Sequence, residues 1–392
     1  MPAARRLFPG LVPGLVAALV AIGLALGLAL GPMTASPLAQ ELRFFRIGTG
    51  TTGATYFPIG GLIANAISNP PGSRPCERGG SCGVPGLIAV AQATSGSVEN
   101  LNLMAAGTLE SAMSQADIAF WAHTGTGPYE GRPPMTGLRA IANLYPETVH
   151  LVVRADAGID DVGDLAGKVV SLGDEGSGTL IEARAILAAH GLDESDVDAR
   201  YLRPGPAADR LAEGGIDAFF IVAGQPVAAV ADAAARVPIR LVELAGPEVE
   251  DLLDFPFFVE TEIAEGVYPG VPATRTLAVG AQWLVREDVD DDLVYGITRA
   301  LWHPSTQLLL AGGHPRGAEI VPGNALTGLA VPLHPGAERF YREAGLLPDE
   351  EPGEVAPEPA LPEPALPELD AAAGPKPSAG MIPGRKPVPA AR

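Results

Sequence analysis

Two loops rich in glycine and small hydroxyl residues constrain the fold of this chain more than any other feature. The first, residues 48–53, lies between a strand expected at 44–47 and an apolar helix expected at 59–67. The second, residues 176–179, precedes a further apolar helix. Such a loop offers N–H groups, hydroxyls and a helix N-terminus, the parts of an anion site. A lone loop of this kind is more often a plain turn, but two of them favour two halves of one site.

The segments around the second loop alternate between strand and helix patterns. Strands are expected at 169–173, 216–222 and 239–244, and helices at 179–187, 207–212 and 227–235. This alternation is typical of a mainly parallel α/β sheet. Before it, residues 138–147 are expected to form a strand that ends in a polar turn, and 148–154 a further strand. We therefore expect the chain to leave one sheet there and enter another.

Composition excludes several classes of function. The 392 residues, 47% of them apolar, are enough for two domains with sizeable cores. The formal net charge of −20 argues against binding of nucleic acid, which requires a basic surface. It also argues against electrostatic attachment to a membrane surface. We expect an acidic, soluble protein.

The two ends of the chain differ from the rest. Arg5 and Arg6 precede an apolar run at 11–30 and a segment of small residues, a pattern that predicts an export signal over 1–39, cleaved near Ala39. The run is nearly long enough to span a bilayer, so a membrane-anchored form is the alternative. Residues 348–392 are rich in proline and poor in large apolar residues, and we expect a disordered tail.

The two cysteines, Cys76 and Cys82, lie in an excursion rich in glycine, proline and charge. Five residues, two of them glycine, separate the cysteines and can bend enough to join them. In an exported protein we expect a small disulfide loop. A zinc site is not expected, because two thiols lack companion ligands. His123 and His150 are distant in sequence, and their proximity to the thiols in space is left open.

Motifs of catalysis are weak or missing in the sequence. No Gly-x-Ser-x-Gly motif surrounds Ser177, since Glu175 stands two residues before it, and no phosphate-binding Walker loop occurs. Residues 48–53 match Gly-x-Gly-x-x-Gly, but a dinucleotide site also needs a strand with an acidic end about 20 residues further on. That region is the cysteine excursion. We expect a binding protein rather than an enzyme, with no cofactor, metal or catalytic residue.

Several segments resemble the TAXI family of solute receptors, which serve tripartite ATP-independent periplasmic (TRAP) transporters. The resemblance covers residues 43–345 in order. Its segments are 47–50, 53–60, 94–101, 115–117, 144–147, 176–179, 217–220 and 331–337. The cysteine excursion and the tail look like additions to the shortest members of the family.

The resemblance implies a type-II periplasmic-binding fold, in which two α/β lobes enclose a ligand cleft and the chain crosses between them twice. The implied organisation places the first lobe at 40–150 and 257–347 and the second lobe at 151–256. Family members bind small carboxylates such as glutamate and 2-oxoglutarate and do not depend on one ligand-clamping arginine. None is evident in the loops of this chain.

The candidate ligand-binding residues lie at expected strand ends and helix starts. Ser97 is also a candidate helix N-cap, and Glu147 is expected to repel an anion unless the ligand carries an amino group. The predicted set is Gly53, Ala54, Thr55, Tyr56, Ser97, Asn100, Gln115, Asn143, Tyr145, Ser177, Gly178, Thr179, Ala223, Gly224 and Gln225.

The resemblance further implies a periplasmic receptor, expected to be a monomer, that binds a small carboxylate or an amino acid. It would deliver this ligand to TRAP membrane subunits for import driven by an ion gradient. The alternative is an exported sensing subunit that acts on a membrane histidine kinase.

Overall fold

The computed structural model describes residues 42–348. The export signal expected at 1–39 and nearly all of the tail expected at 348–392 lie outside the described residues. Within 42–348, no helix combines the length and apolar character needed to cross a membrane.

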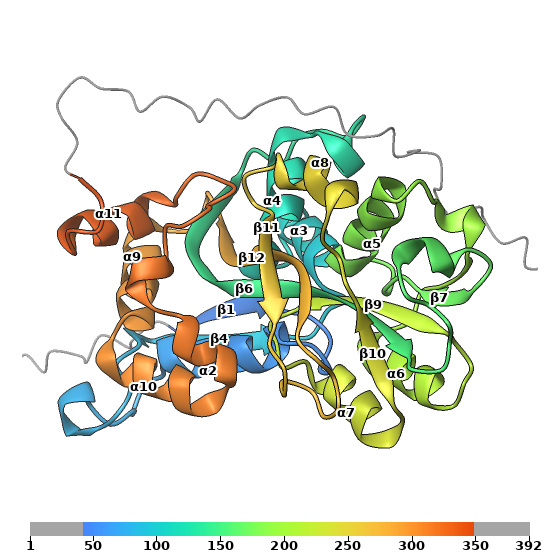
Figure 1. Cartoon of the computed structure of the whole chain (residues 1–392). Coiled ribbons are helices and arrows are strands. Elements are labelled where there is room, and N and C mark those ends of the chain that lie inside the picture. The colour runs from blue at the N-terminus through green and yellow to red at the C-terminus, as the bar shows by residue number, and fades with distance from the viewer. Residues whose placement is uncertain (1–41, 349–392) are drawn as a thin grey trace, which may run out of the picture. The chain divides into compact units, whose positions relative to one another are not determined.

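The described chain is built on one ten-stranded mixed sheet (Figure 1). Two trios of parallel strands form its flanks, and two long antiparallel strands lie between them. The first trio is β4 (Leu87–Gln92), β1 (Arg43–Gly48) and β5 (Ser111–Gln115). The second is β9 (Ala218–Ala223), β7 (Val169–Ser171) and β8 (Asp198–Arg200). The long strands are β12 (Thr274–Arg286) and β6 (Leu138–Arg154), which also pair with β11 (Val259–Ile263) and β10 (Ile239–Val242), respectively.

Strand β6 corrects two expectations. It runs for 17 residues without the turn expected at 145–147. Its first part pairs with β12 and its last part, from Thr148, pairs with β9. One strand therefore carries the chain from the first half of the sheet to the second, and β12 carries it back to β5. Because both crossing strands pair antiparallel, the sheet is mixed rather than mainly parallel. The α/β class with two crossings, as in a type-II periplasmic-binding fold, is confirmed.

Helices follow most parallel strands and cover the sheet (Figure 1). They are α2 (Tyr56–Ile67), α3 (Ser97–Ala105), α4 (Ala116–Thr124), α5 (Gly178–Ala189), α6 (Pro204–Ala212), α7 (Ala228–Arg236), α8 (Glu250–Leu253), α9 (Asp291–Leu301), α10 (Pro304–Gly313) and α11 (Pro335–Glu343).

The predicted N-cap of α3 is wrong by one residue. Gly96 is the N-cap, with φ +128°, and Ser97 is the first helical residue. The Ser97 hydroxyl is engaged elsewhere, since it accepts a hydrogen bond from the Gln115 backbone N–H at 3.1 Å. Glycine suits the cap because a positive φ strains other residues.

The hydrophobic clusters reflect the two crossings of the chain between the halves of the sheet. One cluster joins residues between 45 and 145 with residues between 281 and 341, so the two ends of the described chain share a core. A second cluster draws mainly on residues 207–271. A third runs through both halves. The division into lobes at 40–150 with 257–347 and at 151–256 stays a prediction, since the third cluster spans both.

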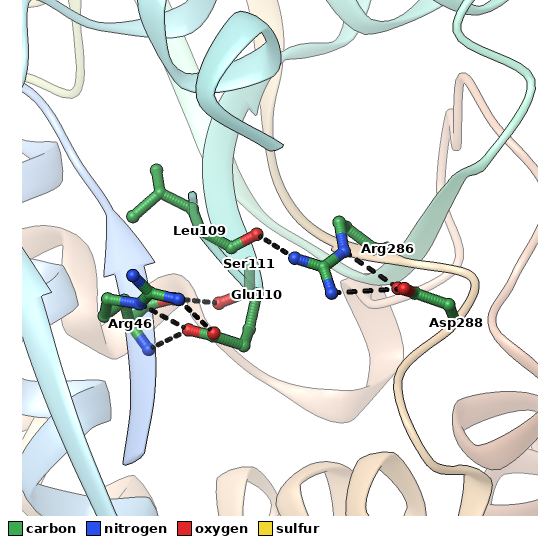
Figure 2. A network of polar contacts seen from close by, with 6 residues as sticks. All are labelled: Arg46, Leu109, Glu110, Ser111, Arg286 and Asp288. Atoms are coloured by element: carbon green, nitrogen blue, oxygen red, sulfur yellow. Dashed lines mark hydrogen bonds and ion pairs between the residues drawn. The ribbon is translucent and has the colours of Figure 1, made fainter. Parts of the chain in front are cut away.

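A polar network joins β1, β5 and the end of β12 (Figure 2). The backbone N–H and Nε of Arg46 both donate to Glu110 Oε2, at 2.8 and 2.9 Å. Arg286 donates to the Leu109 carbonyl at 3.0 Å and pairs with Asp288. These contacts lie at the start of β5, whereas Gln115 ends that strand at the cavity described below.

The cysteine excursion forms a small unit of its own. A disulfide joins Cys76 and Cys82, as predicted. Two short parallel strands, β2 (Ser68–Asn69) and β3 (Val84–Pro85), bracket the loop. His303, which the sequence analysis did not associate with the cysteines, places its Nε2 3.8 Å from Cys76 Sγ. The expectation that no histidine accompanies the two thiols is therefore wrong.

Candidate ligand-binding cavity

A small cavity, with a volume of about 40 Å³, lies between residues at the carboxyl ends of the two parallel trios. Such a volume holds a few water molecules. Its lining comes from both sides of the crossing strands. The lining residues are Gly50, Thr51, Ala54, Tyr56, Ser95, Gly96, Ser97, Gln115, Glu147, Asp174, Ser177, Gly178, Thr179, Pro204, Ile221 and Val222.

All six strands of the two trios point their carboxyl ends at the cavity. On the first side, Gly50 follows β1, Ser95 follows β4 and Gln115 ends β5. On the second side, residues after β7, β8 and near the end of β9 line the wall. Ligands of α/β proteins bind at this edge of a sheet.

Five helices begin at the cavity wall. Helices α2, α3, α5 and α6 start at the lining residues Tyr56, Ser97, Gly178 and Pro204, and Gln115 is the N-cap of α4. The N–H groups of a first helical turn lack intrahelical acceptors, and the helix dipole is positive at this end. The five N-termini together favour a negatively charged group in the cavity.

Two carboxylic acids oppose this positive field. Glu147 and Asp174 both line the cavity, whereas none of the described lining residues is Lys, Arg or His. Glu147 is 2% exposed and accepts a hydrogen bond of 2.7 Å from the Tyr56 hydroxyl. Burial raises the pKa of Glu147 to about 8, since the Tyr56 hydrogen bond only partly offsets the loss of solvation. With this pKa, Glu147 is largely protonated at pH 7.

Asp174 offers an unused acceptor. The residue is 8% exposed, and its Oδ2 has no hydrogen-bond partner among the described residues. The Arg203 Nε lies 3.6 Å from this oxygen, on a side chain that is 66% exposed. Burial raises the pKa of Asp174. A cationic hydrogen-bond donor in the cavity would satisfy this carboxylate.

Two further buried acids, Asp117 and Glu182, lie behind the cavity wall. Glu182 Oε2 accepts from the Gln115 side-chain amide at 3.1 Å, and neither carboxylate oxygen of Asp117 has a partner among the described residues. Burial raises the pKa of Asp117 to about 7. Burial and the charges of Asp117 and Glu147 raise the pKa of Glu182. Burial is the main cause of both shifts and favours the protonated form of each acid above its usual pH range.

The structure brings seven of the fifteen predicted residues to the cavity and places eight elsewhere. The seven are Ala54, Tyr56, Ser97, Gln115, Ser177, Gly178 and Thr179. The eight outside the lining are Gly53, Thr55, Asn100, Asn143, Tyr145, Ala223, Gly224 and Gln225.

The residues outside the lining have structural contacts instead. Asn100 is fully buried, and its amide donates to the carbonyls of Thr49 and Met113 at 2.6 and 2.8 Å. Thr55 donates to the Gly224 carbonyl at 2.7 Å. Arg316, which the sequence analysis did not consider, donates through Nε to the Gln225 carbonyl. These contacts hold the wall rather than face the cavity.

Several lining residues were not predicted from the sequence. Thr51, Ser95, Asp174 and Pro204 all follow the carboxyl ends of strands, and this position was a signal available in the sequence. Glu147 was noted but left out of the set, because it was assigned to a turn and expected to repel an anion.

The two halves touch around the cavity. The Glu99 N–H donates to the Gly176 carbonyl at 2.9 Å, and the Gln115 amide reaches Glu182. Gly178 is required for this approach, because a Cβ there would lie 1.5 Å from Gln115 Oε1. The structure therefore shows a closed arrangement, in which the two loops recognised in the sequence lie on opposite walls of one cavity.

Solved structures with distant similarity are solute-binding proteins by name. The alkanesulfonate-binding protein SsuA of Xanthomonas axonopodis pv. citri, bound to MOPS, is 18% identical, with 78% of this chain and 85% of that chain covered and a TM-score of 0.42. SsuA of Escherichia coli is 15% identical, with 78% and 94% covered and a TM-score of 0.40. An ancestral arginine-binding protein bound to arginine is 14% identical, with 67% and 92% covered and a TM-score of 0.39. Similarity at this level says nothing about the ligand of the present chain.

The match to a protein-family model is more extensive. The model of the NMT1-like family matches residues 47–345, about three quarters of the chain. The matched segment begins in β1 and ends just after α11, so it contains both parallel trios and both crossing strands. The chain belongs to the NMT1-like family.

Proposed function

We propose that this protein is an extracytoplasmic solute receptor that closes on a small zwitterion of the α-amino-acid class. One observation carries the proposal. The cavity between the two halves combines five helix N-termini with two buried carboxylic acids and no basic lining side chain among the described residues. A ligand with both a carboxylate and an ammonium group matches both parts.

The carboxylate of the ligand is assigned to the start of α5. The N–H groups of Gly178 and Thr179 lie in the first turn and lack intrahelical acceptors. The Ser177 side chain is engaged as the N-cap, accepting from the Leu180 N–H at 3.2 Å. The backbone, rather than an arginine, would therefore bind the carboxylate.

The ammonium group is assigned to Glu147, with Asp174 as a second acceptor. An ammonium beside Glu147 would lower the pKa of that acid from about 8 and release its proton. A dicarboxylate without an amino group, such as 2-oxoglutarate, has no cationic group to pair with either acid. Among the expected ligands, the geometry thus supports glutamate-like amino acids over keto acids.

The closed cavity of about 40 Å³ is smaller than such an amino acid. The two halves therefore have to separate before the ligand enters. A ligand that bridges Glu147 and the start of α5 would favour closure, because it touches both halves at once.

The proposed place of action is the periplasm, where the receptor would act as a monomer with TRAP membrane subunits of the TAXI type. The runner-up is an exported sensor acting on a membrane histidine kinase. Co-purification of the full chain with co-expressed TRAP membrane subunits would favour transport. Association with a histidine kinase and none with those subunits would favour sensing.

A thermal-shift screen tests the ligand class. Each L-amino acid is compared with the keto acid of the same side chain, and L-glutamate with 2-oxoglutarate in particular. We expect stabilisation by one or a few amino acids and little by their keto acids. Equal stabilisation by both members of a pair would contradict the assignment of Glu147 to an ammonium group.

A further inference from the structure

We propose that Cys76, Cys82 and His303 form a metal site that binds Zn²⁺ when the disulfide is reduced. The site lies between the excursion at 69–85 and the start of α10, and none of its three residues lines the cavity. It is independent of the proposed solute-binding function.

The three ligand atoms lie close enough to reach one ion once the disulfide opens, and the two Sγ atoms, bonded to each other here, then have to move apart. The three atoms all lie within 4.8 Å of one another, and His303 Nε2 is 3.8 Å from Cys76 Sγ. In a tetrahedral site with Zn–S near 2.3 Å and Zn–N near 2.0 Å, neighbouring ligand atoms are about 3.5 Å apart. Small side-chain movements are sufficient to bring the atoms onto one ion.

The loop keeps its shape through contacts other than the disulfide. The N–H groups of Arg78 and Gly80 both donate to the Pro75 carbonyl at 3.0 Å, and Gly79 donates to the Cys76 carbonyl at 2.9 Å. A Cβ at Gly80 would lie 1.7 Å from the Arg74 carbonyl oxygen, so the turn is tightly packed. We therefore expect the two thiols of the reduced protein to remain close together.

His303 can release its Nε2 for a metal. Its Nδ1 lies 2.8 Å from Ser305 Oγ and 3.2 Å from the Ser305 N–H. Because Nδ1 accepts from the Ser305 N–H as the N-cap of α10, the proton is on Nε2 in this arrangement. Metal binding moves that proton to Nδ1, which then donates to Ser305 Oγ and leaves the Nε2 lone pair for the ion. A hydrogen bond from the other ring nitrogen is typical of metal-binding histidines.

Formation of the site begins with reduction of the disulfide. A dithiol reductant gives two electrons and two protons, the Sγ–Sγ bond breaks, and the reductant becomes its own disulfide. This leaves two thiols. Zn²⁺ then displaces both thiol protons, so that two thiolates and a neutral imidazole hold the ion with no net charge. A fourth position stays open for water.

The donor set determines the class of ion. Thiolate and imidazole ligands suit zinc and softer ions, whereas calcium and magnesium require oxygen ligands. The metal would take the place of the disulfide as the cross-link within the loop. Through His303 it would also connect the loop to the start of α10.

Zinc titration of the full chain tests the proposal. The protein is reduced with dithiothreitol, desalted without oxygen, and titrated with Zn²⁺ against a chromophoric chelator. We expect one equivalent to bind with release of two protons, and Co²⁺ to give the thiolate charge-transfer absorption of a tetrahedral site. The oxidised protein serves as a folded, thiol-free control and should not bind.

A histidine variant tests the third ligand. His303→Asn keeps a helix-capping side chain at the start of α10 but removes the imidazole, and we expect at least tenfold weaker binding. His190→Asn, at the C-cap of α5, is the matched control and should bind as the unmodified protein does. Equal binding by reduced and oxidised protein, no binding by reduced protein, or unchanged affinity in His303→Asn would each overturn the proposal.

Discussion

The two loops that dominate the sequence differ in what holds them. The first is fixed within its own half: the Thr49 carbonyl accepts from Asn100 at 2.6 Å and from Thr94 at 2.9 Å. The second makes close contacts with the opposite half, through Gly176 to Glu99 and through Gly178 against Gln115. The two loops therefore have different roles despite their similar composition. The first loop is a preformed wall, and the second loop closes against it.

The glycines of the two loops show the same difference. A Cβ at Gly53 would have its nearest neighbour at 3.6 Å, which is ordinary van der Waals contact. A Cβ at Gly178 would lie 1.5 Å from Gln115 Oε1 and 3.0 Å from Ser97 Oγ. In this structure the opposite half fills the space beside Gly178. This closed packing thus leaves no room for a Cβ at Gly178 unless Gln115 shifts, whereas it leaves room at Gly53.

The largest expected effect comes from Gly178→Ala. The added methyl group prevents the approach of Gln115, so the variant should remain open and lose binding of L-glutamate, or of the best ligand from the screen. Calorimetry measures the binding, and small-angle scattering should show a larger radius of gyration than for the unmodified protein. Gly53→Ala is the matched control and should bind and close normally. Wild-type affinity in Gly178→Ala would show that the second loop does not close on the first.

The next effect is on folding stability and concerns the first loop. Asn100→Ala removes the donors to the Thr49 and Met113 carbonyls and the acceptor for Thr94 at 2.8 Å. Three buried hydrogen bonds are lost, although Thr94 still donates to the Thr49 carbonyl at 2.9 Å, and the free energy of unfolding should fall by about 3 kcal/mol. Ser177→Ala, in the second loop, loses one N-cap bond and should cost about 1 kcal/mol. Denaturant titration measures both, and equal costs would contradict the distinction between the loops.

A pH effect of intermediate size follows from the acids between the two walls. The folded-state pKa values of Asp117 and Glu147 are raised to about 7 and about 8, and that of Glu182 is also raised. Over the range from about 4 to about 8, the unfolded chain has lost these protons while the folded chain retains them. Stability is therefore present below pH 4 and is lost as the pH rises toward 8.

Chemical denaturation at pH 5 and pH 8 measures this effect. The variant Asp117→Asn/Glu147→Gln/Glu182→Gln should have a smaller decline in the free energy of unfolding over this range. If the variant and the unmodified protein decline equally, these three acids do not carry the pH dependence.

The smallest expected effect is that of Thr55→Val. This change removes the hydrogen bond of 2.7 Å from Thr55 to the Gly224 carbonyl while keeping the shape of the side chain. Loss of one such contact costs about 1 kcal/mol, so the Kd for the ligand should rise about fivefold. A change larger than that seen in Gly178→Ala would reverse the relative importance of the two contacts.

Much of the fold was predictable because its patterns are local. Strand and helix periodicity and the two glycine-rich loops predicted two α/β halves and a cavity between them. The length of β6 was not predictable, because Pro146 and Glu147 resemble a turn, whereas in the sheet they pair with Gly280 and Val279 of β12. Tertiary pairing outweighed the local signal.

The candidate site was predictable only in part, for a related reason. Tyr56 and Gly178, which begin helices, line the cavity as predicted. Each follows a strand in the sequence, so its position in the chain was enough to place it at this edge of the sheet. The direction of a side chain was not evident, so Asn100 was assigned to the ligand although its amide points into its own half. Glu147 was set aside on charge because the five helix N-termini that balance it come from distant segments.

The central claim is that Glu147 recognises an ammonium group inside the closed cavity. Its most direct test is calorimetry with L-glutamate and 2-oxoglutarate on the unmodified protein and on Glu147→Gln, which retains an acceptor for the Tyr56 hydroxyl. The account predicts that the unmodified protein prefers L-glutamate by at least tenfold and that Glu147→Gln loses most of this preference. An unchanged preference in the variant, or tighter binding of 2-oxoglutarate by the unmodified protein, would contradict it.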